Sequence, residues 1–233
     1  MKGAQGIKLL AGLIAAVSFF TSGQVYSGVE IQGTRVIYPQ ASNQVALDIK
    51  NPDNRAYLIQ AWAAKKPDIN DHDDQVFVMT PPLFRLEPTS TNSVRIVYTG
   101  KPLPDDKESL YWLSIKSIPS TNPDEINTLT INVKSVMKLF FRPTSIKGDP
   151  ATAYQGLKFK FDAGRLHIIN PSPYYITLAT LLLDNKKVPE PPMIPPHAEV
   201  ILPGEYKETQ NISWQSINDF GGVSNEMKLA NFK

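Results

Sequence analysis

Residues 129–143 read LTINVKSVMKLFFRP, and this stretch decides the predicted fold. Its alternate apolar side chains share one face of an extended chain: Leu129, Ile131, Val133 and Met137. The polar residues between them line the opposite face. The pattern predicts a β-strand with two possible roles. It is either the last strand of a sandwich, with its apolar face on the core, or an edge strand that offers this face to another chain.

Similar short runs, rich in β-branched and aromatic residues, precede this strand and are separated by turn signals. They cover residues 29–38, 44–50, 57–64, 76–80, 93–98 and 110–118. Together with residues 129–141 they predict seven strands, which is typical of an immunoglobulin-like sandwich.

The strand pattern restarts after Arg142 and Pro143. Further runs lie at residues 157–161, 165–169, 174–183, 197–202, 213–217 and 227–232. A proline directly after a strand, followed by the polar residues 147–150, is typical of a domain boundary. We therefore expect an all-β protein with two β domains, residues 28–142 and 143–233, rather than one large sandwich.

The composition excludes several classes of function. The 233 residues include 20 Pro, 3 His and no Cys. This proline content disfavours a helical bundle, and the missing cysteines exclude disulfides, thiolate metal sites and a Cys nucleophile. We find no G-x-S-x-G motif and expect no catalytic residue, cofactor or metal site. The acidic residues 68–74 lack the central Gly and closing Glu of a calcium loop, which favours a solvated hairpin tip over a cation site.

Residues 1–27 have the pattern of a secretory signal peptide. Lys2 and Lys8 both precede an apolar run at residues 9–20. This run is too short to span a membrane. Cleavage after Ser27 would lower the 24 basic residues to 22, equal to the 22 acidic ones. We therefore expect an exported protein without membrane insertion, and its neutral charge does not favour nucleic-acid binding.

Six segments, in order, resemble the periplasmic pilus chaperones of the chaperone–usher pathway. They are GTRVIYP at 33–39, YLIQAW at 57–62, FVMTPP at 77–82 with RLEP at 85–88, ESLYW at 108–112, KLFFRP at 138–143 and INDFGG at 217–222. The resemblance implies two immunoglobulin-like β-sandwich domains set at an angle, with a cleft between them. It also implies a non-enzymatic protein of the Gram-negative periplasm.

The resemblance further implies a mechanism. Such a chaperone lends its seventh strand to the groove of an incomplete pilin subunit and later delivers the subunit to an outer-membrane usher. Leu129, Ile131, Val133 and Met137 would enter the groove, while Ser135 interrupts this row. The family's cleft cations correspond to Arg35 and Lys138, which would bind the carboxylate at the C-terminus of the subunit.

Strict alternation would place Lys138 on the face opposite Met137, so a strand twist or a bulge would have to aim it at the cleft. Three further residues match the family's interdomain salt-bridge network, and we interpret them as structural: Glu108, Arg142 and Asp219.

The short segment between Pro119 and Leu129, together with the lack of cysteine, resembles the short-loop branch of the family. An exposed apolar strand would also favour weak self-association of the free protein. An exported β-sandwich adhesin or carbohydrate-binding module is the alternative, and a secreted hydrolase is a more distant one. A carbohydrate module needs exposed aromatic side chains, but Trp62 and Trp112 lie in strand patterns and are expected in the core.

Overall fold

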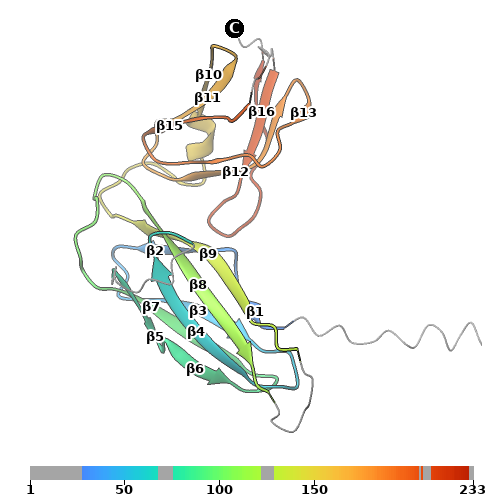
Figure 1. Cartoon of the computed structure of the whole chain (residues 1–233). Helices are drawn as coiled ribbons and strands as arrows, with labels where there is room; N and C mark the ends of the chain where they lie inside the picture. Colours follow the sequence, from blue (N-terminus) through green and yellow to red (C-terminus); the bar gives the residue numbers. More distant parts are fainter. Residues whose placement is uncertain (1–27, 68–75, 122–128, 205, 207–210, 231–233) are drawn as a thin grey trace, which may run out of the picture.

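The computed structural model describes residues 28–67, 76–121, 129–204, 206 and 211–230. The expected leader, the acidic stretch 68–74 and the last three residues lie outside these ranges. The chain folds into two β domains placed end to end, as Figure 1 shows. The predicted all-β, two-domain class is therefore confirmed. No helix in the described ranges is long and apolar enough to cross a bilayer.

The first domain pairs a four-stranded sheet with a five-stranded one. The four-stranded sheet has the order β1 (Glu30–Ile31), β3 (Val45–Lys50), β7 (Thr91–Tyr98), β5 (Phe77–Thr80). The five-stranded sheet has the order β2 (Arg35–Pro39), β9 (Val133–Arg142), β8 (Ser109–Pro119), β4 (Tyr57–Ala64), β6 (Leu83–Leu86). The pairing of β2 with β9 is parallel, and the other ladders of these two sheets are antiparallel.

Two elements of the first domain differ from the sequence prediction. The expected strand at residues 29–38 is split into β1 and β2, which belong to different sheets. Gly33 lies between them with φ of 96°, in the left-handed region that favours glycine, and here the chain changes sheets. Strand β6 was not predicted, because its four residues follow Pro81 and Pro82 and do not alternate cleanly.

Strand β9 has one covered edge and one partly free edge. Its register with β8 runs without a shift from the pair Ser117–Val133 to the pair Ser109–Phe141. On the other edge, β2 pairs only with residues 138–142. Within the described residues, positions 133–137 therefore have a strand on one side only. The predicted start of this strand at Leu129 was four residues too early, since β9 begins at Val133.

The core of the first domain corrects one predicted site residue. Tyr38, Phe77 and Phe141 from both sheets are in ring contact at the centre of this core. Met137 belongs to the same core and is only 8% exposed. Met137 and Val133 lie on the same face of β9, as predicted. At residue 137, however, this face is covered by the four-stranded sheet. Met137 is therefore unavailable to a partner, and its place in the predicted groove-binding row was wrong.

Of the two strand tryptophans of the first domain, Trp62 is buried as expected, while Trp112 is only partly buried and lies outside the central core, contrary to expectation. Trp112 pairs with Lys138 across β8 and β9, so it lies on the outer face of the five-stranded sheet. Trp62 lies on the same face but is only 6% exposed, and Lys134 Nζ is 5.2 Å from its ring centroid. Trp214 is buried in the second domain. These placements leave the carbohydrate-binding alternative without a platform of exposed tryptophans.

The second domain repeats the two-sheet arrangement on a smaller scale. One sheet has the order β10 (Lys158–Asp162), β11 (Arg165–Asn170), β15 (Ala198–Ile201). The other has the order β13 (Lys186–Lys187), β12 (Ile176–Leu183), β16 (Asn211–Ser216), β17 (Met227–Ala230), and β14 (Met193–Ile194) also pairs with β12. A short 3₁₀ turn, η1 (Ala153–Gly156), precedes β10. Its Tyr154 carbonyl accepts a 2.9 Å hydrogen bond from Trp214 Nε1 in the core.

Candidate functional site

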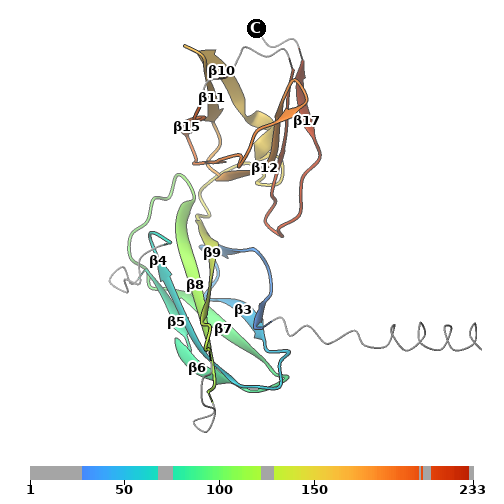
Figure 2. The same ribbon diagram turned by 45° about the vertical axis from the view of Figure 1, so that its right-hand side comes forward.

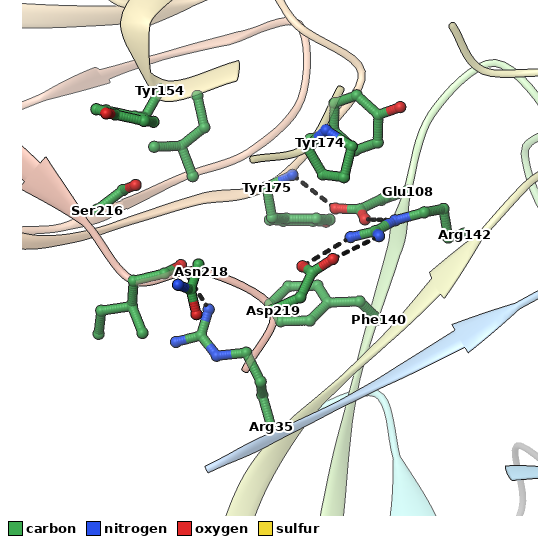
Figure 3. Close-up of a pocket in the computed structure, with 13 residues that line it drawn as sticks. Arg35, Glu108, Phe140, Arg142, Tyr154, Tyr174, Tyr175, Ser216, Asn218 and Asp219 are labelled. Atoms are coloured by element: carbon green, nitrogen blue, oxygen red, sulfur yellow. Dashed lines mark hydrogen bonds and ion pairs between the residues drawn. The ribbon is translucent and has the colours of Figure 1, made fainter. Parts of the chain in front are cut away.

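An ion-pair network joins the two domains at the end of β9. Arg142, the last residue of that strand, donates from Nε to Glu108 Oε1 at 2.7 Å. Its two terminal nitrogens donate to both oxygens of Asp219, at 2.7 and 2.9 Å. Asp219 belongs to the loop between β16 and β17, which reaches toward the first domain in both ribbon views (Figures 1 and 2). The structure thus brings Glu108, Arg142 and Asp219 together (Figure 3).

Glu108 is the most deeply buried member of this network, with a side chain only 2% exposed. Its second carboxylate oxygen accepts a 2.8 Å hydrogen bond from the backbone N–H of Tyr175 in the second domain. Burial raises the pKa of Glu108, and the charge of Arg142 with the Tyr175 hydrogen bond oppose that rise. Burial lowers the pKa of Arg142, but the bonds to Asp219 and Glu108 outweigh burial and leave it above its ordinary value. The positive charge of Arg142 is therefore strongly favoured by its acidic partners, while the burial of Glu108 carries a cost that Arg142 and the Tyr175 N–H partly offset.

Apolar contacts complete the junction between the domains. The rings of Phe140 and Tyr175 lie 5.5 Å apart, centroid to centroid, and Arg142 lies 5.4 Å from the ring of Tyr174. The cavity left among these side chains measures about 20 Å³. A small-molecule site usually needs ~300 Å³ or more, so this junction fixes the domains rather than holding a substrate.

Arg35 opens β2 and faces the second domain. Its Nη1 donates a 3.1 Å hydrogen bond to the carbonyl of Ile217, the first residue after β16 (Figure 3). Its Nε is buried and has no hydrogen-bond partner. Burial lowers the pKa of Arg35, and the acids of the interdomain network only partly oppose this effect.

Lys138 is the direct neighbour of Arg35 in the parallel ladder between β2 and β9. Its Nζ donates to Thr177 Oγ1 of the second domain at 3.5 Å. Burial lowers the pKa of Lys138, and the positive charge of Arg35 lowers it further. No bulge is needed to aim it, because the register of β9 is regular. The face opposite Met137 is the one that turns toward the second domain.

Arg35 and Lys138 form a positively charged pair that lacks an acidic partner. Among the described residues, no carboxylate lies within salt-bridge distance of either side chain. Two half-buried cations side by side stabilise an anion strongly, because an arriving carboxylate offsets both burial and mutual repulsion. The arrangement therefore suits capture of a carboxylate at this end of the free edge of β9.

The free edge is bordered by exposed apolar side chains that lead up to this cationic pair. Leu129, Ile131 and Val133 are 83%, 65% and 53% exposed. Ser135 is half-buried, and the row then continues into the core at Met137. Large apolar side chains exposed in series at the start of a strand and in the segment that precedes it are typical of an interaction surface.

Three residues of this junction were not predicted from the sequence. The backbone N–H of Tyr175 binds Glu108, the ring of Tyr174 contacts Arg142, and Thr177 accepts from Lys138. The only signal was an aromatic pair directly after Pro173, which lies in a turn before β12. A backbone donor carries no side-chain signature, so the contact of Tyr175 could not be read from residue types.

Two family models match the chain over most of its length. The model of the "Pili and flagellar-assembly chaperone, PapD N-terminal domain" matches residues 28–147, and that of the "Pili assembly chaperone PapD, C-terminal domain" matches residues 152–228. The chain belongs to the pili assembly chaperone family. The recognition drawn from the six sequence segments is thereby confirmed.

Curated relatives and solved structures agree with this assignment. The chaperone protein FimC of Escherichia coli K12 is 36% identical over 223 residues, covering 94% of this chain and 91% of the relative. LpfB of Salmonella typhimurium, also a chaperone protein, is 33% identical and covers 91% and 90%. The SafB chaperone of Salmonella enterica, solved in complex with the SafA pilin, is similar with a TM-score of 0.78 and 31% identity. That match covers 90% of this chaperone and 98% of SafB.

Proposed function

We propose that this chaperone captures a fimbrial subunit in the periplasm by adding the free edge of β9 to the subunit's incomplete sheet. The observation that carries the proposal is the free edge at residues 133–137, bordered by exposed apolar residues and ending at Arg35 and Lys138. An unpaired strand edge binds an extended segment through backbone hydrogen bonds, and alternate side chains add specificity. The chaperone relatives, and the SafB chaperone solved in complex with the SafA pilin, support a pilin subunit as the client.

Strand β2 defines where the bound segment ends. Beyond residue 137 the edge of β9 is occupied by β2, so a partner strand that follows this edge toward the second domain stops beside Arg35. At that point the side chains of Arg35 and Lys138 form a site suited to an anion. A subunit that ends there would place its terminal carboxylate between the two cations.

The wider role follows from family membership and the leader. The chaperone enters the periplasm by means of its signal peptide at residues 1–27, binds pilin subunits without enzymatic chemistry, and delivers them to an outer-membrane usher. Three exposed apolar side chains, each contributing up to ~1.5–3 kcal/mol when buried, supply part of the binding free energy. Association and ordering costs reduce the net value.

Periplasmic co-expression of the chaperone with a fimbrial subunit tests the proposal. We expect wild-type chaperone to yield a soluble one-to-one complex in size-exclusion chromatography and Arg35→Ala to lose it, because half of the carboxylate site is gone. Arg95→Ala is the matched control, since Arg95 is exposed on β7 in the other sheet. Equal complex from wild type and Arg35→Ala would contradict anchoring at this site.

Charged substitutions in the exposed apolar row separate binding from folding. We expect Ile131→Asp and Val133→Asp to abolish complex formation while leaving the melting temperature within about 2 °C of wild type, because both side chains are already exposed. Met137→Ala should instead destabilise the first domain by about 2–5 kcal/mol, as is typical of large-to-small changes in a core. The measurements are thermal unfolding and subunit pull-down. Normal subunit capture by both Asp variants would refute the role of this row.

A further inference from the structure

The loop between β16 and β17 carries the most exposed large apolar side chain among the described residues. Phe220 is 95% exposed. Single exposed apolar residues are common on protein surfaces and need no explanation by themselves. The position of Phe220 does call for one, because its loop borders the end of the free edge of β9.

The loop is placed by contacts on both sides of Phe220. Asp219 is bound by Arg142 of the first domain, as described above. At Gly221, a β-carbon would lie only 2.6 Å from Thr34 Oγ1, and φ there is 84°. Only glycine fits this approach without strain. The loop therefore packs directly on Thr34, the residue that precedes Arg35.

The backbone that presents Phe220 is fixed by hydrogen bonds within the loop. Asn218 Oδ1 accepts from the N–H groups of Phe220 and Gly222, at 3.0 and 2.9 Å. The backbone carbonyl of Asn218 accepts from the N–H of Gly221 at 3.0 Å, and the backbone N–H of Asn218 donates to the carbonyl of Gly222 at 2.8 Å. A side chain on a turn held in this way loses little backbone freedom on binding, which favours affinity.

These contacts place Phe220 next to the expected end of a bound subunit. Phe220 directly precedes Gly221, the residue that packs on Thr34, and consecutive Cα atoms are about 3.8 Å apart. Arg35, one step farther along β2, binds the carbonyl of Ile217 at the start of the same loop. The partner strand proposed above ends beside Arg35. At 95% exposure the ring of Phe220 is almost wholly open to contact by a bound strand.

We propose that Phe220 is a further subunit-binding residue, whose ring packs against an apolar side chain in the last residues of the captured subunit. The inference rests on the proposed function, since it requires a chain end between Arg35 and Lys138. In this arrangement Phe220 is a third contribution of the second domain to the cleft, beside Thr177 and the Ile217 carbonyl. It adds an apolar contact that distinguishes an apolar subunit terminus from a polar one.

Binding of a synthetic peptide that carries the subunit's C-terminal strand gives the first test. We expect Phe220→Ala to weaken binding about tenfold and Phe220→Tyr to retain it, because a ring is preserved. Val78→Ala is the matched control, as Val78 is 43% exposed on β5 in the sheet that does not contain β9. An unchanged melting temperature of Phe220→Ala would show that folding is intact. Equal affinity of Phe220→Ala and wild type would overturn the inference.

The same peptide with an amidated C-terminus separates this inference from the proposed function. Amidation removes the carboxylate, so it should weaken binding to wild type and to Phe220→Ala alike if the cationic pair anchors the chain end. Wild type that binds neither peptide would overturn the proposed function and this inference with it. Strong discrimination against the amide together with normal affinity of Phe220→Ala would overturn only the role of Phe220.

A photo-crosslinking amino acid at position 220 identifies the contact directly. In the co-expressed complex we expect a crosslink to the last residues of the subunit, located by mass spectrometry of the joined peptides. The same amino acid at position 78 should give none. A position-220 crosslink to a distant part of the subunit, or no crosslink to the subunit at all, would overturn the proposal.

Discussion

Replacing Lys138 with Met is expected to stabilise the free chaperone and to weaken subunit binding. In the free protein, burial and the neighbouring Arg35 lower the pKa of Lys138, which means that its charge is destabilising where it stands. Met preserves most of the side-chain volume without the charge. We expect the melting temperature of the first domain to rise by roughly 2–4 °C, a modest gain because the site is half-exposed and solvent screens the repulsion.

The same substitution removes one of the two cations that we propose bind the subunit's terminal carboxylate. Truncating one member of a buried charge pair costs 2 kcal/mol or more, so the affinity for the subunit's C-terminal peptide should fall at least ~30-fold. Lys116→Met is the matched control, since Lys116 lies on the same face of the sheet in β8, seven residues from Ser109 at the end of the strand nearest the cleft. A variant that is both less stable and normal in binding would contradict this account of Lys138.

The pH dependence of this effect has a definite sign. The folded-state pKa of Lys138 is lower than the unfolded value of 10.5, so the unfolded chain binds more protons between these two values. Stability of the wild type should therefore rise with pH across that window, and the advantage of Lys138→Met should shrink there. Thermal unfolding of both proteins at neutral pH and near pH 10.5 measures this convergence. A constant difference would show that the gain of the variant is not electrostatic.

Replacing Arg142 with Met is expected to cause the largest loss of stability. Glu108 would stay buried while losing its ion-pair partner, and breaking a buried pair in this way costs about 3–5 kcal/mol. The bond to Asp219 would disappear as well, so the angle between the domains should become variable. Urea unfolding measures the first effect, and small-angle scattering measures the second.

An exposed ion pair of the same length provides the control. Arg85 Nε lies 2.7 Å from Glu87 Oε1, the same distance as in the Arg142–Glu108 pair, but both side chains are largely exposed. Arg85→Met should change stability by no more than about 1 kcal/mol. The double variant Arg142→Met with Glu108→Gln should recover part of the loss, because no carboxylate then lies buried without a partner. Similar losses for Arg142→Met and Arg85→Met would argue against burial as the cause.

The strands were largely predictable because their periodicity is local. The predictions were wrong where the packing of neighbouring strands decides which side chains are buried. Met137 and Val133 share a parity, yet only the packing of the second sheet over residue 137 makes one buried and the other exposed. Strand β8 is apolar on both faces, so alternation could not tell that Trp112 faces outward while Tyr111 and Leu113 fill the core.

The site was only partly predictable for the same reason. Arg35 and Lys138 were found through short segments that resemble the family, and their placement as ladder neighbours needed the three-dimensional structure. Contacts through the backbone, such as the Tyr175 N–H to Glu108, leave no trace in residue types. Phe220 was part of a recognised segment, but its exposure depends on how the loop meets the first domain.

The parallel pairing of β2 with β9 has a consequence for quality control. Because β2 occupies the edge of β9 from residue 138 onward, a chaperone that binds the client's terminal carboxylate as proposed would set the register of the bound strand from the client's last residue. A subunit lengthened by one residue would either leave its carboxylate outside the cleft or shift by one position, which turns every side chain of the bound strand to the opposite face. The chaperone would thus bind truncated or lengthened subunits poorly, and they would not be delivered to the usher.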